Sequence, residues 1–299
     1  MSTMSNVETV AKPKLPGFSR WARIMRSLTF YVPVIILALL ILTAIFAPLL
    51  APHDPVKVSL IDRRLPPSFI EGGSTEYYLG TDSLGRDILS RAIYGARISL
   101  SVALLVVGIT AAFGTMLGIT AGYMGGRIEA FLMRVTDISM AFPGLVLAML
   151  LSVGIGPGFL TVVLALSLLG WAPYARLIRG ETLRLRESDF VAQARISGAS
   201  SLRIMRVHIF PNIINQLIIV MTMAIGATIL AEAALSFLGI GIPPPTPSWG
   251  SMVSDGRNDL SKAWWISTFP GILIGLVVMS GNFFGDWLRD KLDPKLRQL

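Results

Sequence analysis

The stretch R-L-R-E-S-D-F-V-A-Q-A-R-I-S-G-A-S-S-L-R-I-M-R-V-H-I-F-P-N, residues 184–212, decides how the rest of the chain is arranged. Seven of its 29 residues are charged: five arginines, Glu187 and Asp189. Long apolar runs lie on both sides of it. The pattern predicts two short helices joined by a turn at Gly198, ordered enough to be the docking site of a partner. The apolar residues at helical spacing are Phe190, Val191, Ala194, Ile204 and Val207.

The composition is that of a membrane protein. Of the 299 residues, 53% are hydrophobic and only 15% are charged, and the mean hydropathy is +0.66. Soluble domains carry roughly 25% charged residues. The net charge of +8 does not indicate a nucleic-acid partner, because the charges lie between apolar segments instead of forming a basic patch with aromatics. The chain has no cysteine, which excludes thiol catalysis, thiolate metal sites and disulfides.

Six apolar runs are each long enough to cross about 30 Å of hydrocarbon. The first is too long for a signal-peptide core, so we expect an uncleaved helix. The expected fold class is an all-α membrane protein of six transmembrane helices. A coupling loop lies between the fourth and fifth helices, and a long outer segment follows the first. The runs are residues 29–50, 98–123, 131–153, 158–179, 212–240 and 267–288.

The positive charges predict the orientation. With the N-terminus inside, 18 of the 26 Lys and Arg residues lie in inner segments and 8 in outer ones. Both tails and the coupling loop are therefore expected in the cytoplasm. The predicted organisation is a tail at 1–28, the first helix at 29–50, an outer segment with a short surface helix at 51–97, a five-helix core at 98–288 with its coupling loop at about 184–211, and a tail at 289–299.

No motif indicates catalysis on this chain. It contains no G-x-x-x-x-G-K-[ST] loop to hold the phosphates of ATP. His53 and His208 lack partners at the spacing of metal ligands. We therefore expect no enzyme activity, no metal and no cofactor on the chain itself.

Gly114, Gly118 and Gly122 recur every four residues in the second apolar run. Small residues at this spacing let two helices approach closely in lipid. Packing within the bundle is the favoured interpretation, and a contact face for another subunit is the alternative.

Two groups of charged residues each allow two interpretations. Glu232 lies inside the apolar run 213–238, where a carboxylate is costly. It is either a residue of a translocation pathway or a structural hydrogen-bonding group near the outer end of its helix. Asp82, Arg86 and Asp87 could form a cation or substrate site, but solvation or local pairing is favoured for charges at a membrane surface.

Several motifs resemble the permeases of binding-protein-dependent ABC importers. Their cytoplasmic signature is E-A-A, three residues, G, and then a hydrophobic-x-P. Ala192-Gln193-Ala194, Gly198 and Ile209-Phe210-Pro211 occupy those places here. Because Ala192 and Gln193 replace the usual Glu and Ala, the resemblance carries over the helix-turn-helix geometry but no charge contact.

Other motifs resemble the C-type permease subunits of dipeptide, oligopeptide and nickel importers, and look closest to the dipeptide type. They include G-T-D-S-L-G-R-D-I-L-S-R (80–91), L-S-F-L-G (235–239), P-x-W-G-x-M (247–252) and G-D-W-L-R-D-x-L-D-P (285–294). The resemblance extends from about residue 30 to the C-terminus.

The resemblance implies a subunit of an importer in the bacterial inner membrane. A homologous B-type permease would complete the pathway, two ATP-binding cassette subunits would bind ATP and Mg, and an extracytoplasmic binding protein would deliver dipeptides or oligopeptides. Nickel, glutathione and opine-type solutes remain alternatives. A membrane scaffold that recruits a cytoplasmic partner is an alternative of another class, and a secondary transporter is less favoured. The residues implied in coupling to the ATPases are Asp189, Ala192, Ala194, Arg195, Ser197, Gly198, Ala199 and Pro211.

Overall fold

A computed structural model describes residues 20–292, with side chains from Tyr31 onward. Residues 1–19 and 293–299, and so most of the two predicted tails, lie outside the described residues. Within the described range the secondary structure is helical apart from one isolated bridge between Thr81 and Asp87. The elements are α1 (Arg20–Ile45), α2 (Ala47–Leu50), α3 (Ile88–Met124), α4 (Gly126–Ala141), α5 (Gly144–Ile155), α6 (Phe159–Arg186), α7 (Asp189–Ile196), α8 (Ser201–Arg203), η1 (Ile204–Ile209), α9 (Phe210–Phe237), α10 (Trp249–Gly256), η2 (Arg257–Asp259) and α11 (Trp265–Leu292).

Four helices of the described residues are long and apolar enough to span a membrane, and a bent pair could make a fifth. The all-helical membrane fold is thus confirmed, but the predicted count of six spans is not. The first predicted span is divided between α1 and α2, and the apolar part of α1 whose side chains are described, Tyr31–Ile45, is shorter than a span. The four spans are α3, α6, the continuous helix Ser201–Phe237 and α11.

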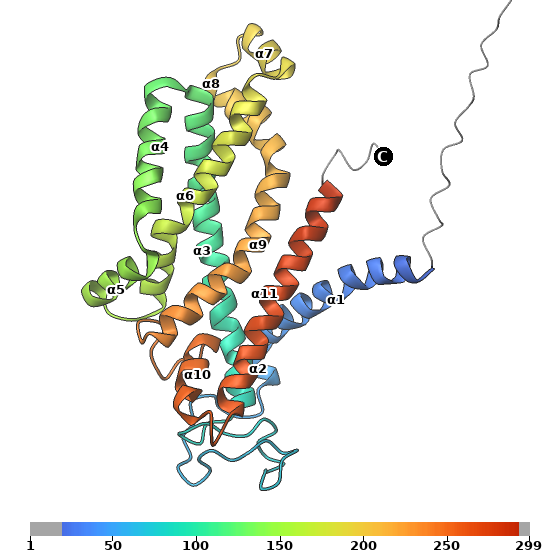
Figure 1. Cartoon of the computed structure of the whole chain (residues 1–299), viewed down its shortest axis with the longest axis vertical. Helices are drawn as coiled ribbons and strands as arrows, with labels where there is room; N and C mark the ends of the chain where they lie inside the picture. Colours follow the sequence, from blue (N-terminus) through green and yellow to red (C-terminus); the bar gives the residue numbers. More distant parts are fainter. Residues whose placement is uncertain (1–19, 293–299) are drawn as a thin grey trace, which may run out of the picture.

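The predicted third span is broken in the middle. Its residues form α4 and α5, which meet at an angle of 83°. Pro143 explains the break, because a proline disfavours helical geometry in the residue before it. That residue, Phe142, has extended backbone angles (φ −79°, ψ 131°). The bend turns α5 across the end of α4 (Figure 1).

The second span begins earlier than predicted. Residues 88–97, expected to form a separate surface helix, are the first turns of α3. Asp87 starts this helix, since its carboxylate accepts a hydrogen bond from the Ser90 amide at 2.9 Å. With 37 residues α3 is about 55 Å long at 1.5 Å per residue, so it extends well beyond the hydrocarbon.

Gly114, Gly118 and Gly122 of α3 pack against α6. This agrees with the favoured interpretation, packing within the bundle. A Cβ atom added to Gly114 would lie 2.4 Å from the carbonyl oxygen of Trp171. One added to Gly118 would lie 2.7 Å from that of Ala175, and Gly122 is equally close to Thr182. The two helices therefore touch backbone to backbone, which only glycine permits here.

Four of the outer charges form an ion-pair network in which Asp82, Arg86 and Arg91 are buried and Asp255 is partly exposed. The Arg86 guanidinium lies 2.6 Å from Asp82 and 3.2 Å from Asp255, and Arg91 lies 3.3 and 3.1 Å from the same two carboxylates. Two positive and two negative groups thus neutralise one another, which favours pairing over a cation site. The network joins residues 82–91 to α10. This end of the molecule is opposite α7 and α8 along the long axis (Figure 1).

Candidate functional site

The loop between α6 and α9 has one separate helix, α7, and a second helical part that merges with the following span. Ser188 ends the preceding turn, and its amide donates to the Leu185 carbonyl at 3.0 Å. The segments α8, η1 and α9 then form one continuous helix, Ser201–Phe237. The predicted pair of helices is therefore a short helix followed by the projecting end of a membrane span.

Gly198 closes α7 with a Schellman motif. The Gly198 amide donates to the Arg195 carbonyl at 3.1 Å, and the Ala199 amide donates to the Ala194 carbonyl at 3.1 Å. Gly198 has φ +78°, a conformation that side chains with a Cβ disfavour. A Cβ added there would meet no atom within 4 Å. The glycine is therefore needed for its backbone angle and not for space.

A π-helical segment separates the loop from α9. Pro211 has no amide hydrogen and its ring would clash with the carbonyl four residues earlier in a regular α-helix. The segment Ile204–Ile209 relieves this clash with the wider π turn. Both Ile204 and Ile209 are fully buried. They lie five residues apart, which is the hydrogen-bond spacing of a π-helix. Pro211 is exposed at the start of α9, away from the tip of the loop.

The residues implied in coupling are not all equally accessible. Ala194 and Ala199 pack against the core of the loop. Arg195 places its guanidinium 5.9 Å from the ring centre of Tyr123 at the end of α3, a cation–π contact that holds the loop to the bundle. The exposed members are Asp189, Ala192, Arg195, Ser197, Gly198 and Pro211.

Sequence reasoning missed the apolar residues of this surface. Ile196 is 87% exposed and Leu202 is 59% exposed, on the two sides of the Gly198 turn. Of the apolar residues at helical spacing, Phe190 and Val207 are also exposed, while Val191 and Ile204 are fully buried. Exposed apolar side chains on a loop outside the spans are typical of a protein-docking site.

Glu232 is fully buried and hydrogen-bonded by three serines from three elements. Its carboxylate accepts from Ser236 of α9 at 2.8 Å, from Ser248 at the start of α10 at 2.9 Å, and from Ser99 of α3 at 3.3 Å. The Trp249 amide in turn donates to the Ser99 hydroxyl at 3.2 Å. Of the two roles left open, this geometry favours the structural one, because the carboxylate joins three elements at the outer end of α9.

A bundle of membrane-spanning helices with an exposed helical loop between two of them is the architecture expected of a transport permease. Two protein-family models match the chain. Residues 114–298 match the model of the "Binding-protein-dependent transport system inner membrane component", and residues 19–67 match the "N-terminal TM domain of oligopeptide transport permease C". The chain belongs to this family of binding-protein-dependent transport permeases. It is thus a multi-pass component of the inner membrane.

Curated relatives of nearly the same length are about 40% identical. The chain is 39% identical to the dipeptide transport system permease protein DppC of Haemophilus influenzae, over 99% of this chain and 100% of the relative. It is 40% identical to DppC of Bacillus subtilis, over 97% and 90%. It is also 39% identical to the glutathione transport system permease protein GsiD of Shigella boydii, over 98% and 96%.

A solved structure has a similar fold. A chain of the MetNI methionine ABC transporter, in an inward-facing conformation, superposes with a TM-score of 0.55 at 14% identity. The match covers 67% of this chain and 97% of that one.

Proposed function

We propose that this chain is the C-type permease subunit of an ATP-driven importer of dipeptides. Full-length relatives named as dipeptide permeases support the cargo class, and the relatives named for glutathione keep a tripeptide-like cargo as the alternative. In this proposal a second permease completes the pathway, two ATPase subunits bind ATP and Mg inside, and a binding protein delivers the cargo outside.

The observation that carries the proposal is the exposed apolar loop. Ile196, the last residue of α7, and Leu202 of α8 flank the glycine turn and are exposed. Both helices lie at the end of the molecule opposite the outer segment (Figure 1). A cleft of an ATPase subunit would bury these side chains, and the proposed contacts with Asp189, Ser197 and Gly198 would surround them. In this proposal the loop and both termini lie on the cytoplasmic side.

The loop is built to transmit movement. On one side α7 follows α6 after a two-residue break, and on the other the loop continues as the helix Ser201–Phe237 without interruption. A displacement of α8 would therefore move α9 with it, and a displacement of α7 would act on α6 through the short connection. Closure of the ATPases would favour one arrangement of the two helices, and ATP hydrolysis would release it, because the docked loop makes different contacts in the two states.

The docking proposal is tested by a charged substitution at the most exposed apolar residue of the loop. Ile196→Glu should lower the amount of ATPase that copurifies with the permease pair, while the two permeases stay associated. Ile61→Glu is the matched control, because Ile61 is 96% exposed at the opposite end of the molecule. Full recovery of the ATPases with Ile196→Glu would contradict the proposal and favour a scaffold with another partner.

A further inference from the structure

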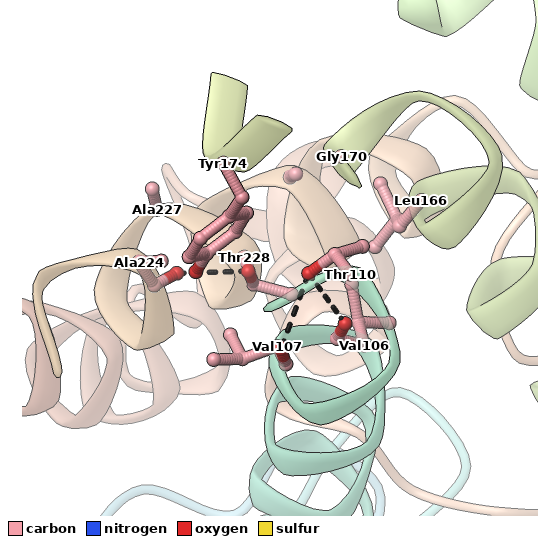
Figure 2. Close-up of a pocket in the computed structure, with 10 residues that line it drawn as sticks. Val106, Val107, Thr110, Leu166, Gly170, Tyr174, Ala224, Ala227 and Thr228 are labelled. Carbon is pink, nitrogen blue, oxygen red and sulfur yellow. Dashed lines mark hydrogen bonds between the residues drawn. The ribbon is translucent and has the colours of Figure 1, made fainter. Parts of the chain in front are cut away.

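A cavity of about 210 Å³ lies between α3, α6 and α9, in the middle of the bundle (Figure 2). At about 30 Å³ per water molecule it has room for roughly seven waters. Gly170 of α6 keeps it open, since a Cβ there would lie 2.8 Å from the Thr110 methyl group. Its lining contains no charged side chain, and its polar side chains are Thr110, Tyr174 and Thr228.

The three hydroxyl groups have different hydrogen-bonding capacity. Thr228 donates its proton to the Ala224 carbonyl at 2.8 Å, and Thr110 donates to the Val106 carbonyl at 2.7 Å (Figure 2). Both threonine oxygens therefore remain free to accept a hydrogen bond from the cavity.

Tyr174 supplies the donor. Its side chain is only 5% exposed, and its hydroxyl has no hydrogen-bond partner of good geometry in the described range, although the Thr110 hydroxyl is close enough to interact with it weakly. A buried hydroxyl without a good partner is costly. Figure 2 shows the ring pointing from α6 into the space between α3 and α9.

From this arrangement we infer that the cavity binds the amide group of the peptide cargo during its passage. Tyr174 would donate to the peptide carbonyl oxygen, and Thr110 or Thr228 would accept from the peptide N–H. A neutral amide carries one acceptor and one donor, as the lining requires. The charged termini of a dipeptide flank this amide and would find no counterion in the lining, so they would lie toward the open side of the cavity. The contact is independent of the cargo's side chains, so the site takes peptides as a class and does not hold any one of them tightly.

This inference rests on the proposed function, and its test uses the complete importer in proteoliposomes. The cargoes are a dipeptide and the analogue in which an ester oxygen replaces the amide N–H. For each cargo, uptake by a variant is compared with uptake by the wild type, so the preference of the binding protein cancels.

We expect Thr228→Val to lower dipeptide uptake about two- to tenfold, the usual range for one lost hydrogen bond, and to leave ester uptake unchanged. Tyr174→Phe should lower uptake of both cargoes by a similar factor, because the ester keeps its carbonyl. Thr222→Val is the control and should change neither, since Thr222 lies in α9 with the same kind of bond, to the Ile218 carbonyl at 2.8 Å, but does not line the cavity.

Equal loss of both cargoes in Thr228→Val would overturn the inference and assign the cavity to water or packing. Unchanged dipeptide uptake in Tyr174→Phe would overturn it as well. Failure of the wild-type complex to import the dipeptide would refute the proposed function itself, and the inference with it.

Discussion

Gly198 offers a sharp test of how the loop is built. Its φ of +78° lies in the left-handed region, which costs a residue with a Cβ about 1–2 kcal/mol. A new side chain meets no atom of the chain within 4 Å, so the cost comes from the backbone alone. Gly198→Ala should therefore shift the equilibrium between the native turn and other conformations by a factor of roughly 5–30. Gly198→Asn should shift it less, because asparagine tolerates this conformation.

The outer end of α9 provides a matched control. Gly239 has φ +80° and equally open surroundings, and the amides of Gly239 and Ile240 close α9 with the same two hydrogen bonds. Gly239→Ala should thus cost a similar amount without touching the loop.

The assay measures peptide uptake per ATP hydrolysed in proteoliposomes. We expect uptake per ATP to fall in the order wild type, Gly198→Asn, Gly198→Ala, and Gly239→Ala to resemble the wild type. Equal losses for Gly198→Asn and Gly198→Ala would refute the conformational argument, and an equal loss for Gly239→Ala would refute the assignment of coupling to the loop.

Three further substitutions test the packing and the buried polar groups, each by thermal unfolding of the purified complex. Gly118→Ala should destabilise the protein by about 1–3 kcal/mol, because its Cβ would lie 2.7 Å from the Ala175 carbonyl; Gly108→Ala in the same helix has free space and should be neutral or slightly stabilising. Glu232→Gln keeps one accepting oxygen for the serines and should cost about 1 kcal/mol, whereas Glu232→Ala should cost about 3 kcal/mol or more; a large loss of uptake in a stable Glu232→Gln protein would instead favour a pathway role. Arg91→Ala should cost about 3 kcal/mol because it leaves the buried Asp82 and the half-buried Asp255 undercompensated, and an unchanged unfolding temperature would contradict the ion-pair network.

The features that sequence reasoning predicted well have local or periodic patterns. The turn at Gly198 follows from a glycine after a short amphipathic segment, and its hydrogen bonds all lie within six residues. The α3–α6 contact follows from the four-residue glycine spacing. Long apolar runs predicted the helical membrane fold in the same way.

The remaining features depend on contacts between residues far apart in the sequence. Ser99 and Ser248 reach Glu232 from 133 and 16 positions away, and no local pattern indicates that they converge. Pro143 accounts for the break between α4 and α5, but the angle of 83° depends on how α5 packs against α6. The continuous start of α3 was missed because residues 88–97 carry enough charge to resemble a surface helix. The ion pairs to Asp255 allow Arg91, and Arg86 just before the helix, to be buried.

We propose that the loop around Gly198 contacts an ATPase subunit. Because the chain has no cysteine, a single introduced cysteine gives an unambiguous crosslinking site. We predict that Ile196→Cys, in the assembled importer and with a short thiol-to-amine crosslinker, becomes linked to an ATPase subunit, and that Ile61→Cys at the opposite end does not. Crosslinking of the ATPase from position 61, or its absence from position 196 in a complex that hydrolyses ATP, would contradict the account.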